Sequence, residues 1–330
     1  MRNVLHTSIG GTAARITLSN LFGTAPLDVS SVTLAVRAPG GGAGAALGTL
    51  RRVPFAGRHT ATIAPGELLV SDPVALGVPQ DGDLLVSIHT PAAAAGATTH
   101  PRALQTSYVA DGDLTRETSG SAFTSRTPSW HHVTAVDVLT AEARGAVVAV
   151  GDSLTDGAAS THGANARWPD HLSDRLGGRY SVLNAGISGN RLLTEDRGPG
   201  ALDRLDRDVL ARSGVRTVIV AVGINDLLRS PEAPPAAEVV AGYRRLADRA
   251  RARGLRVVGA TLAPAGGTGT ARPRSGRPGR RSTKRYAGET SSTRWPTSTA
   301  HCATPRTRSA WRPPTTAATT CTPATRAARG

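Results

Sequence analysis

The chain has 330 residues, which is long enough for two domains with cores of their own. Its net charge of +15 would favour a nucleic-acid or membrane partner. The charge is concentrated, however, because residues 268–330 hold 13 basic residues and one acid, a balance of +12, whereas the rest of the chain carries only +3. The body of the protein is nearly neutral, so we predict no nucleic-acid partner, and no apolar run is long enough to span a membrane.

Segment 268–330 has the composition of a disordered tail. It contains no Val, Ile, Leu, Met or Phe, so it cannot bury enough apolar area to offset the loss of backbone entropy. The two cysteines, Cys302 and Cys321, both lie there, so cysteine usage indicates nothing about the folded part. We predict a basic, low-complexity, disordered tail.

Residues 1–140 have an all-β pattern. Short alternating or β-branched runs recur between Gly- and Pro-rich turns, without helical periodicity, at 14–18, 31–36, 59–63 and 84–88. That spacing predicts a β-sandwich-like or jelly-roll-like module.

From residue 141 to about 267 the pattern changes to strands that alternate with helices. The expected strands are apolar throughout, which is typical of a parallel sheet covered on both faces. We expect strands at 146–150, 180–183, 217–222 and 255–261, and helices at 164–176, 201–212 and 236–253. A doubly wound sheet would also need a fifth strand and a last helix, which the tail cannot provide.

Ser153 directly follows the first of these strands, in the run Gly151-Asp152-Ser153-Leu154. Open α/β sheets place their ligands at the carboxyl ends of the strands, and a helix N-terminus there favours developing negative charge. Ser153 is therefore a candidate nucleophile with Asp152 in support, although a serine at this position can also be only a helix cap. Thr155 excludes the G-x-S-x-G elbow of α/β-hydrolases.

Two later motifs follow the next two strands and so lie at the same edge of the sheet. They are Ser188-Gly189 and Gly223-Ile224-Asn225-Asp226. A glycine N–H can approach a substrate oxygen closely, and an Asn amide can donate to it, so Gly189, Asn225 and the Ser153 N–H would form an oxyanion hole. Each residue alone could be an ordinary turn glycine or an Asx cap. The three motifs in this order favour the catalytic interpretation.

These motifs resemble the first three sequence blocks of the SGNH, or GDSL-type, hydrolases. The resemblance covers about residues 144–267. It implies a flavodoxin-like doubly wound parallel sheet, Ser153 as the nucleophile, and Gly189 and Asn225 in the oxyanion hole. It also implies that no metal and no organic cofactor takes part.

The all-β part resembles, at 6–11 and 105–108, the module that precedes this domain in secreted bacterial relatives. In those relatives a leader and a further strand come first, so we expect that this chain begins after them. Its first residues pass straight into strand-like sequence, with no signal peptide. The relatives imply a secreted protein, whereas the chain itself leaves localisation and oligomeric state open.

The base that would activate Ser153 is missing from the sequence. In the family it comes from a C-terminal Asp-x-x-His block, but no such spacing follows Asn225, and His301 is the only histidine there. His162 and His171 are near the serine in sequence, but we expect each to be a surface helix or loop residue. No catalytic Asp or His is assigned in this reading frame.

A change of reading frame near residues 266–272 would explain the tail. Each codon is read as the third base of one residue plus the first two of the next, and with C at the third position of Cys321 the Cys321/Thr322 junction gives His. With G or C at most free third positions, the segment from Trp311 can then be read to contain an Asp-x-x-His-Pro block. We hypothesise that a frameshift removed the C-terminal catalytic block.

The sequence thus predicts a serine ester hydrolase that works through an acyl-enzyme, with impaired activity in this chain. The expected substrate is a small acyl ester, including acyl groups on carbohydrates. The alternative is a binding protein whose β-module recognises polysaccharide and whose second domain is catalytically dead. A nucleic-acid binder driven by the Arg-rich tail is a third hypothesis, which the few aromatic residues of the tail disfavour.

Overall fold

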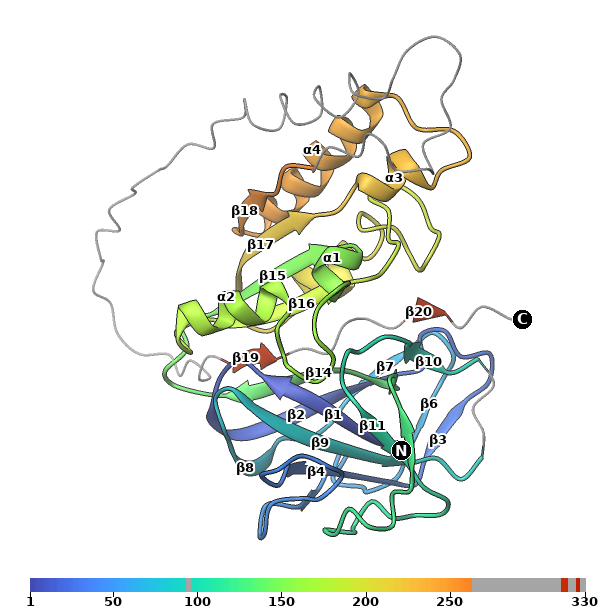
Figure 1. Ribbon diagram of the computed structural model, residues 1–330, viewed down its shortest axis with the longest axis vertical. Helices are drawn as coiled ribbons and strands as arrows, with labels where there is room; N and C mark the ends of the chain where they lie inside the picture. The colour runs from blue at the N-terminus through green and yellow to red at the C-terminus, as the bar shows by residue number, and fades with distance from the viewer. Residues whose placement is uncertain (93–95, 263–315, 320–324, 327–330) are drawn as a thin grey trace.

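The computed structural model describes residues 1–92, 96–262, 316–319 and 325–326. An all-β module is stacked against an α/β domain that follows it in the chain (Figure 1). The last strand of the module before this domain ends at Leu139, and the first strand of the domain begins at Ala146. The predicted boundary between residues 140 and 141 therefore falls in the connection between them.

Two antiparallel sheets make up most of the β-module. One has the strand order β12-β11-β1-β9-β4-β5, and the other has the order β14-β2-β7 with β8 also paired to β2. Smaller pairings join β3 to β6 and β10 to β13. The strands are β1 (Arg2–Thr7), β2 (Gly11–Ser19), β3 (Leu27–Val29), β4 (Ser31–Val36), β5 (Arg51–Arg52), β6 (Ala61–Ile63), β7 (Leu68–Val70), β8 (Val74–Val78), β9 (Gly82–His89), β10 (Thr98–His100), β11 (Ser107–Val109), β12 (Ser125–Thr127), β13 (Trp130–His131) and β14 (Val133–Leu139).

One hydrophobic core lies between these two sheets. Ile16 and Leu18 of β2, Leu34 of β4 and Val136 of β14 are all at most 1% exposed and belong to a single cluster. Burying a side chain of this size stabilises the fold by roughly 1.5–3 kcal/mol. Two antiparallel sheets that share one core agree with the all-β module predicted from the sequence.

Two short strands of the C-terminal segment pair with the β-module. β19 (Thr316–Thr319) pairs antiparallel with β14, and β20 (Thr325–Arg326) pairs antiparallel with β10. The sequence predicts disorder throughout 268–330, and these two strands differ from that prediction. A strand that pairs with an open sheet edge through backbone hydrogen bonds needs no apolar side chain. The amino-acid composition therefore did not reveal these two strands. The rest of the segment lies outside the described residues.

The α/β domain contains a parallel sheet with the strand order β16-β15-β17-β18. The first strand in sequence thus lies between the second and the third, which is the flavodoxin-like order. A fifth strand, if present, would fall outside the described residues. The elements are β15 (Ala146–Gly151), α1 (Ser153–Asp156), α2 (Trp168–Leu176), β16 (Ser181–Gly186), η1 (Asp206–Leu210), β17 (Val215–Ala221), α3 (Ile224–Leu228), α4 (Ala236–Ala252) and β18 (Arg256–Gly259).

Both faces of this sheet are covered. Val148, Leu183 and Val218 are each 0% exposed and share a cluster with residues of α4 and of the segment around η1. Val182 and Asn184 project from the opposite face of β16, where α2 and the β-module line a pocket with them. Coverage on both faces explains why the strands of this domain are apolar throughout.

The predicted helix over 201–212 is wrong in extent. Within that stretch only the single π-helical turn η1 forms, closed by a hydrogen bond from Ala211 N to Asp206 O at 2.8 Å. Asp208 in this turn is buried and pairs with the buried Arg204 at 3.1 Å. Helical propensity does not reveal a buried ion pair of this kind, nor the π-helical turn in which Asp208 lies.

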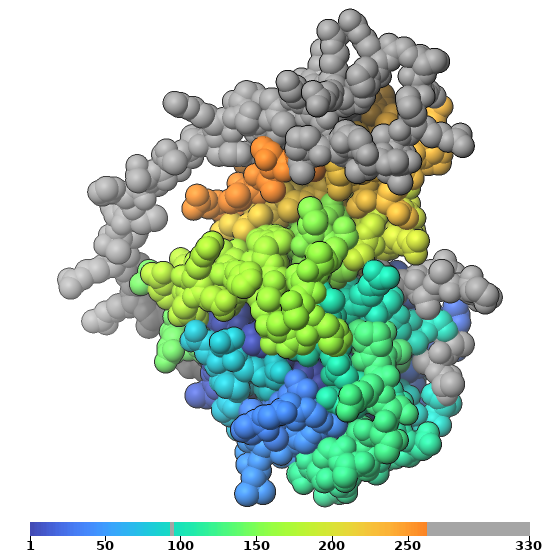
Figure 2. Space-filling view, in the orientation of Figure 1, coloured from blue at the N-terminus to red at the C-terminus, as the bar shows by residue number. Residues whose placement is uncertain are grey.

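The β-module packs directly against the α/β domain. Figure 2 shows the segment around residues 155–175, in lime, in contact with the module, in blue and teal. Ser8 Oγ lies 3.0 Å from Ser181 Oγ, and Gly163 N donates to Leu104 O at 2.9 Å. Side-chain and backbone hydrogen bonds therefore hold the two parts together at more than one place.

His132 makes the stability of the module depend on pH. It is buried, and desolvation together with the neighbouring His131 lowers its pKa from 6.5 to about 4. Above pH 6.5 the imidazole is neutral in both the folded and the unfolded chain. Below that pH the unfolded chain binds a proton that the folded chain excludes, so stability falls until the folded pKa is reached.

We predict that between pH 7 and pH 4 the free energy of unfolding falls by about 3 kcal/mol more in the wild-type chain than in His132→Asn. The φ angle of His132 is +60°, a conformation that Asn tolerates, and Asn does not titrate. Urea unfolding at closely spaced pH values measures the difference. Parallel pH profiles for the two proteins would contradict the prediction.

Candidate functional site

Ser153 begins a one-turn helix, α1, directly after β15. The Asp152 carboxylate caps this helix by accepting a hydrogen bond from Leu154 N at 3.1 Å. Asp152 is buried, Ser153 is half-buried, and Leu154 is 63% exposed. The strand-to-helix junction thus places the serine at the carboxyl edge of the sheet beside an exposed apolar side chain.

The loop that follows β16 packs on the turn that carries Ser153. Ile187 N donates to Gly151 O, the last residue of β15, at 3.1 Å. A Cβ atom at Gly186 would lie 2.2 Å from Asp156 N, so the close approach of the two segments requires glycine. The second predicted motif is therefore in direct contact with the first.

Gly189 lies in this loop with a φ of +82°, a conformation that favours glycine. The preceding residue is held by Asp156, whose Oδ2 accepts hydrogen bonds from Ser188 N at 3.0 Å and from Ser188 Oγ. A Cβ atom at Gly189 would lie 2.7 Å from Arg197 Cγ and 3.7 Å from Arg229 Nε. The aliphatic part of Arg197 and the Arg229 guanidinium, which pairs with Asp196 at 3.1 Å, therefore pack beside Gly189.

Asn225 comes from α3, after β17, and reaches the same loop. Its Nδ2 donates to Asn190 O at 3.0 Å, which uses one of the two amide hydrogens and leaves the second for another acceptor. The neighbouring Asp226 accepts from Leu192 N at 2.7 Å and from Leu193 N at 2.9 Å. The structure thus brings the third predicted motif to the loop that carries the second.

A buried guanidinium lies beneath these three motifs. Arg204, whose side chain is 0% exposed, donates to Ala185 O at 2.8 Å and to Gly151 O at 3.3 Å. It also donates to Asn190 Oδ1 at 3.0 and 3.1 Å and pairs with Asp208 at 3.1 Å. One side chain therefore ties the ends of β15 and β16 to the loop that follows β16.

Two buried carboxyl groups near the serine have raised pKa values. Burial raises the pKa of Asp152, and the nearby Asp226 raises it further, against a hydrogen bond from Leu154 N. Burial also raises the pKa of Asp226, although backbone hydrogen bonds and Arg191 oppose the shift. Perturbed carboxyl groups of this kind gather at functional sites more often than elsewhere.

No histidine forms a hydrogen bond with Ser153 in the described part of the chain, and its Oγ has no partner there. His162 Nε2 lies 2.9 Å from Thr106 Oγ1 in an exposed contact. The side chain of His171 on α2 is 62% exposed. Both histidines lie at the surface, as the sequence predicts, and His301 lies outside the described residues.

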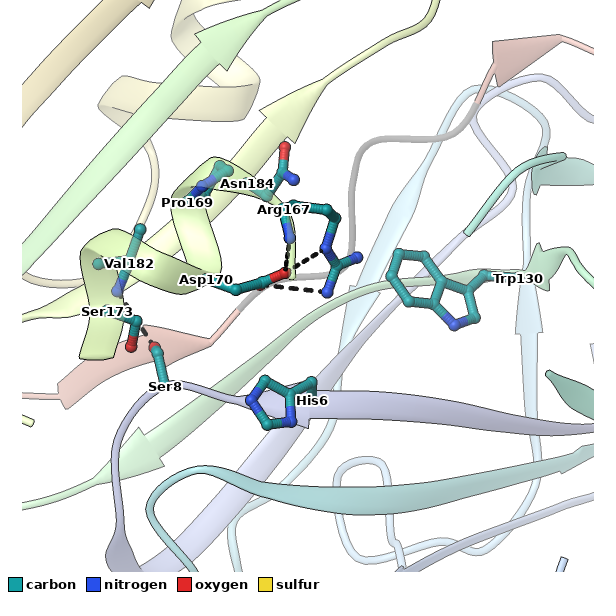
Figure 3. A pocket seen from close by; sticks show the side chains of 9 residues that line it. All are labelled: His6, Ser8, Trp130, Arg167, Pro169, Asp170, Ser173, Val182 and Asn184. Atoms are coloured by element: carbon teal, nitrogen blue, oxygen red, sulfur yellow. Dashed lines mark hydrogen bonds and ion pairs between the residues drawn. The ribbon is translucent and has the colours of Figure 1, made fainter. Parts of the chain in front are cut away.

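A small pocket between the two parts of the molecule is drawn in Figure 3. Ser153, Gly189 and Asn225 do not line it. Inside it the Arg167 guanidinium donates to the Asp170 carboxylate, with Nε 2.6 Å from Oδ2. The pocket is therefore separate from the predicted chemistry. It is lined by His6, Ser8, Trp130, Arg167, Pro169, Asp170, Ser173, Val182 and Asn184.

Within residues 1–92 and 96–262, no group of three or more His, Cys, Asp or Glu side chains is arranged to hold a metal ion. In that same part of the chain, no helix is both long and apolar enough to cross a membrane. The predicted groups at the carboxyl edge of the sheet are the hydroxyl of Ser153, the backbone N–H groups of Ser153 and Gly189, and the side-chain amide of Asn225.

The sequence did not reveal three residues that support this edge: Arg204, Asp156 and His100. Arg204 and Asp208 are four residues apart, a spacing that suits an ion pair on a helix, but the neighbouring Asp203, Asp206 and Arg207 give the sequence no sign of which charges are buried. Asp156 lies inside the Ser153 motif but has no distinctive pattern. His100 gives no signal at all, because its hydrogen-bond partner is far away in the sequence.

Comparison with known proteins finds a family model that matches part of the chain. Residues 149–294 match the model of the GDSL-like lipase/acylhydrolase family. None of the curated proteins matches the chain.

Several solved structures resemble part of the chain. They include AlinE4, an SGNH-hydrolase family esterase (25% identity over 38% of this chain and 62% of that one, TM-score 0.32), the psychrotrophic esterase EstA from Pseudoalteromonas sp. (19% identity, 45% and 70%, TM-score 0.34) and Est24, a carbohydrate acetylesterase from Sinorhizobium meliloti (19% identity, 45% and 78%, TM-score 0.37). The chain spans less than two thirds of the length of AlinE4. With TM-scores this low, we infer nothing from these structures beyond the family match.

We predict that Arg204→Met lowers the free energy of unfolding by about 3–5 kcal/mol. It removes the donor of the buried Gly151 O, Ala185 O and Asn190 Oδ1. It also removes one of the arginines that pair with the buried Asp208, where Arg207 remains at 2.7 Å. The matched control Arg253→Met, at the exposed end of α4, should change stability by no more than about 0.5 kcal/mol. Urea unfolding measures both. Equal stability of the two variants would show that the buried guanidinium does not hold the strand ends.

Proposed function

We propose that this chain, which carries a GDSL-like lipase/acylhydrolase domain, is a serine ester hydrolase with Ser153 as its nucleophile. One observation carries the proposal: three segments that follow successive strands meet at one edge of the sheet. Ile187 N bonds to the end of β15, and Asn225 Nδ2 bonds to Asn190 O in the same loop. Such an arrangement suits acyl transfer, which needs a nucleophile and oxyanion donors within reach of one carbonyl group.

In the proposed reaction Ser153 Oγ attacks the carbonyl carbon of an ester. A C–O bond forms, and the carbonyl π electrons move to the oxygen, which becomes an oxyanion. The tetrahedral intermediate then expels the alcohol, which receives a proton, and water cleaves the acyl-enzyme to release the acid. The serine proton needs a base at the first step, and no described residue is in hydrogen-bond contact to accept it.

We assign the oxyanion to three donors: the Ser153 N–H at the start of α1, the Gly189 N–H and Asn225 Nδ2. The spare amide hydrogen of Asn225 supports this assignment, and so does the φ of +82° that the loop takes at Gly189. Asp152 would act indirectly by capping α1 through Leu154 N, which fixes the turn that carries the serine.

The proposed substrate is a small-molecule ester, including acyl esters of carbohydrates. The resemblance to the SGNH hydrolases supports this class. Leu154, 63% exposed next to the nucleophile, offers an apolar contact for an acyl chain. We propose no cofactor, no nucleic-acid partner and, following the secreted relatives, an extracellular location.

We also propose that the Asp-x-x-His block has been lost by a change of reading frame near residues 266–272. The tail composition and the His that arises at the Cys321/Thr322 junction support this. The family match, by contrast, continues to residue 294, past the proposed shift. The nucleotide sequence of codons 262–275 distinguishes a shift from an intact frame.

The alternative function is polysaccharide binding by the β-module, with a catalytically dead second domain. The observation that favours it is that Ser153 Oγ has no hydrogen-bond partner among the described residues. A serine-reactive phosphonate distinguishes the two functions, because it labels Ser153 only where the hydroxyl is activated.

We predict that this chain hydrolyses p-nitrophenyl acetate poorly, and that a variant with the frame restored after Gly267 is faster by at least about 10²-fold. The reason is that a serine hydroxyl is a weak nucleophile without a neighbouring base. The restored activity should disappear with Ser153→Ala. Equal activity of the two chains would mean that a base is present already, with His162 and His171 the first residues to replace.

A further inference from the structure

A histidine of the β-module reaches the candidate site of the α/β domain. His100 is the last residue of β10, and its Nε2 lies 2.8 Å from Oδ1 of Asp156 in α1. Both side chains are 4% exposed. The contact therefore joins the two parts of the molecule in an environment that excludes water.

The other carboxylate oxygen of Asp156 holds the loop that contains Gly189. Oδ2 accepts hydrogen bonds from Ser188 N, at 3.0 Å, and from Ser188 Oγ. The Gly189 N–H belongs to the peptide group that joins Ser188 to Gly189, so the direction of that N–H depends on how Ser188 is held. A chain of hydrogen bonds thus runs from His100 of β10 through Asp156 to Ser188, the residue before the predicted oxyanion donor.

His100 also controls the charge of this carboxylate. Burial alone would raise the pKa of Asp156, but the adjacent His100 and the hydrogen bonds from His100 and Ser188 hold that pKa below its usual value. Asp156 is therefore ionised at neutral pH and accepts from all its donors. Without His100 the same carboxyl group would be buried with fewer partners and would tend to protonate.

The ring of His100 is held at some cost in free energy. Its centroid lies 5.7 Å from the Trp130 ring, and β10 pairs with β13 so that His100 lies opposite Trp130. The Nε2 atom of His100 faces Asp156, whereas its Nδ1 atom is buried without a partner among the described residues. A buried polar atom without a hydrogen bond destabilises a fold, so such a contact indicates a role other than packing.

We propose that His100 is a positioning residue for the oxyanion hole, and that the β-module is for this reason a structural part of the active site. The proposal rests on the proposed function, because it takes the Gly189 N–H as an oxyanion donor. It gives the module a second role beside any binding of polysaccharide. The residue acts through Asp156 and Ser188 and does not itself contact the substrate.

The test compares three variants of the full chain. His100→Leu removes the hydrogen bond to Asp156, and His100→Gln restores a donor at the position of Nε2. Ser8→Ala is the matched control, because it removes other hydrogen bonds between the two parts, the contact with Ser181 Oγ and the one that Val182 N donates to Ser8 Oγ. Two readouts are used: the rate at which a fluorophosphonate labels Ser153, and amide hydrogen exchange at Ser188 and Gly189, measured by NMR.

We expect His100→Leu to slow labelling at least about tenfold and to speed exchange at Ser188 and Gly189 by a similar factor, with no comparable change at Val148 in β15. His100→Gln should recover both values to within about threefold, and Ser8→Ala should leave both unchanged. Absence of labelling in every chain, including the one with the frame restored after Gly267, would count against the proposed function. The exchange data would still test whether His100 positions the Ser188–Gly189 peptide. Exchange that is unchanged in His100→Leu, or uniformly faster throughout the chain, would overturn the proposal.

Discussion

The candidate site depends on one buried side chain, the guanidinium of Arg204. Buried carbonyl oxygens need donors, and this group donates to Gly151 O and Ala185 O, at the ends of β15 and β16. Because arginine presents five N–H groups in a planar fork, the same side chain also binds Asn190 Oδ1 and pairs with Asp208. An uncompensated charge in this interior would be strongly destabilising, so a guanidinium buried here also needs the carboxylate of Asp208 beside it. The turn after β15 and the loop after β16 are thereby held at a fixed separation.

Much of the α/β fold could be predicted because its signals are local. Apolar runs at 146–150 and 217–222 indicate buried parallel strands, and motifs that follow such strands must meet at one edge of the sheet. The same reasoning places Ser153, Gly189 and Asn225 at one edge from the order of strands and motifs alone. It failed for 201–212, where the chain forms one π-helical turn that contains the buried Asp208 rather than a longer helix.

Contacts between the two parts of the molecule could not be predicted from the sequence. His100 and Asp156 are 56 positions apart, and Ser8 and Ser181 are 173 apart. A histidine that ends a three-residue strand shows no periodicity and no motif, and only the packing of the β-module on the domain brings it to the carboxylate. Strand pairing of 316–319 escaped prediction for a related reason, since backbone hydrogen bonds leave no trace in composition.

The two halves of the proposed site have different physical origins. Among the described residues, the hydrogen bonds that hold Gly189 and Asn225 join residues between His100 and Arg229, so the oxyanion half is built from segments that precede residue 262. A base, by contrast, has to arrive on a separate segment and meet an edge that is already formed. Loss of that segment would then remove proton transfer while leaving the donor geometry in place. In such a protein, catalysis can be lost by a change that the rest of the fold tolerates.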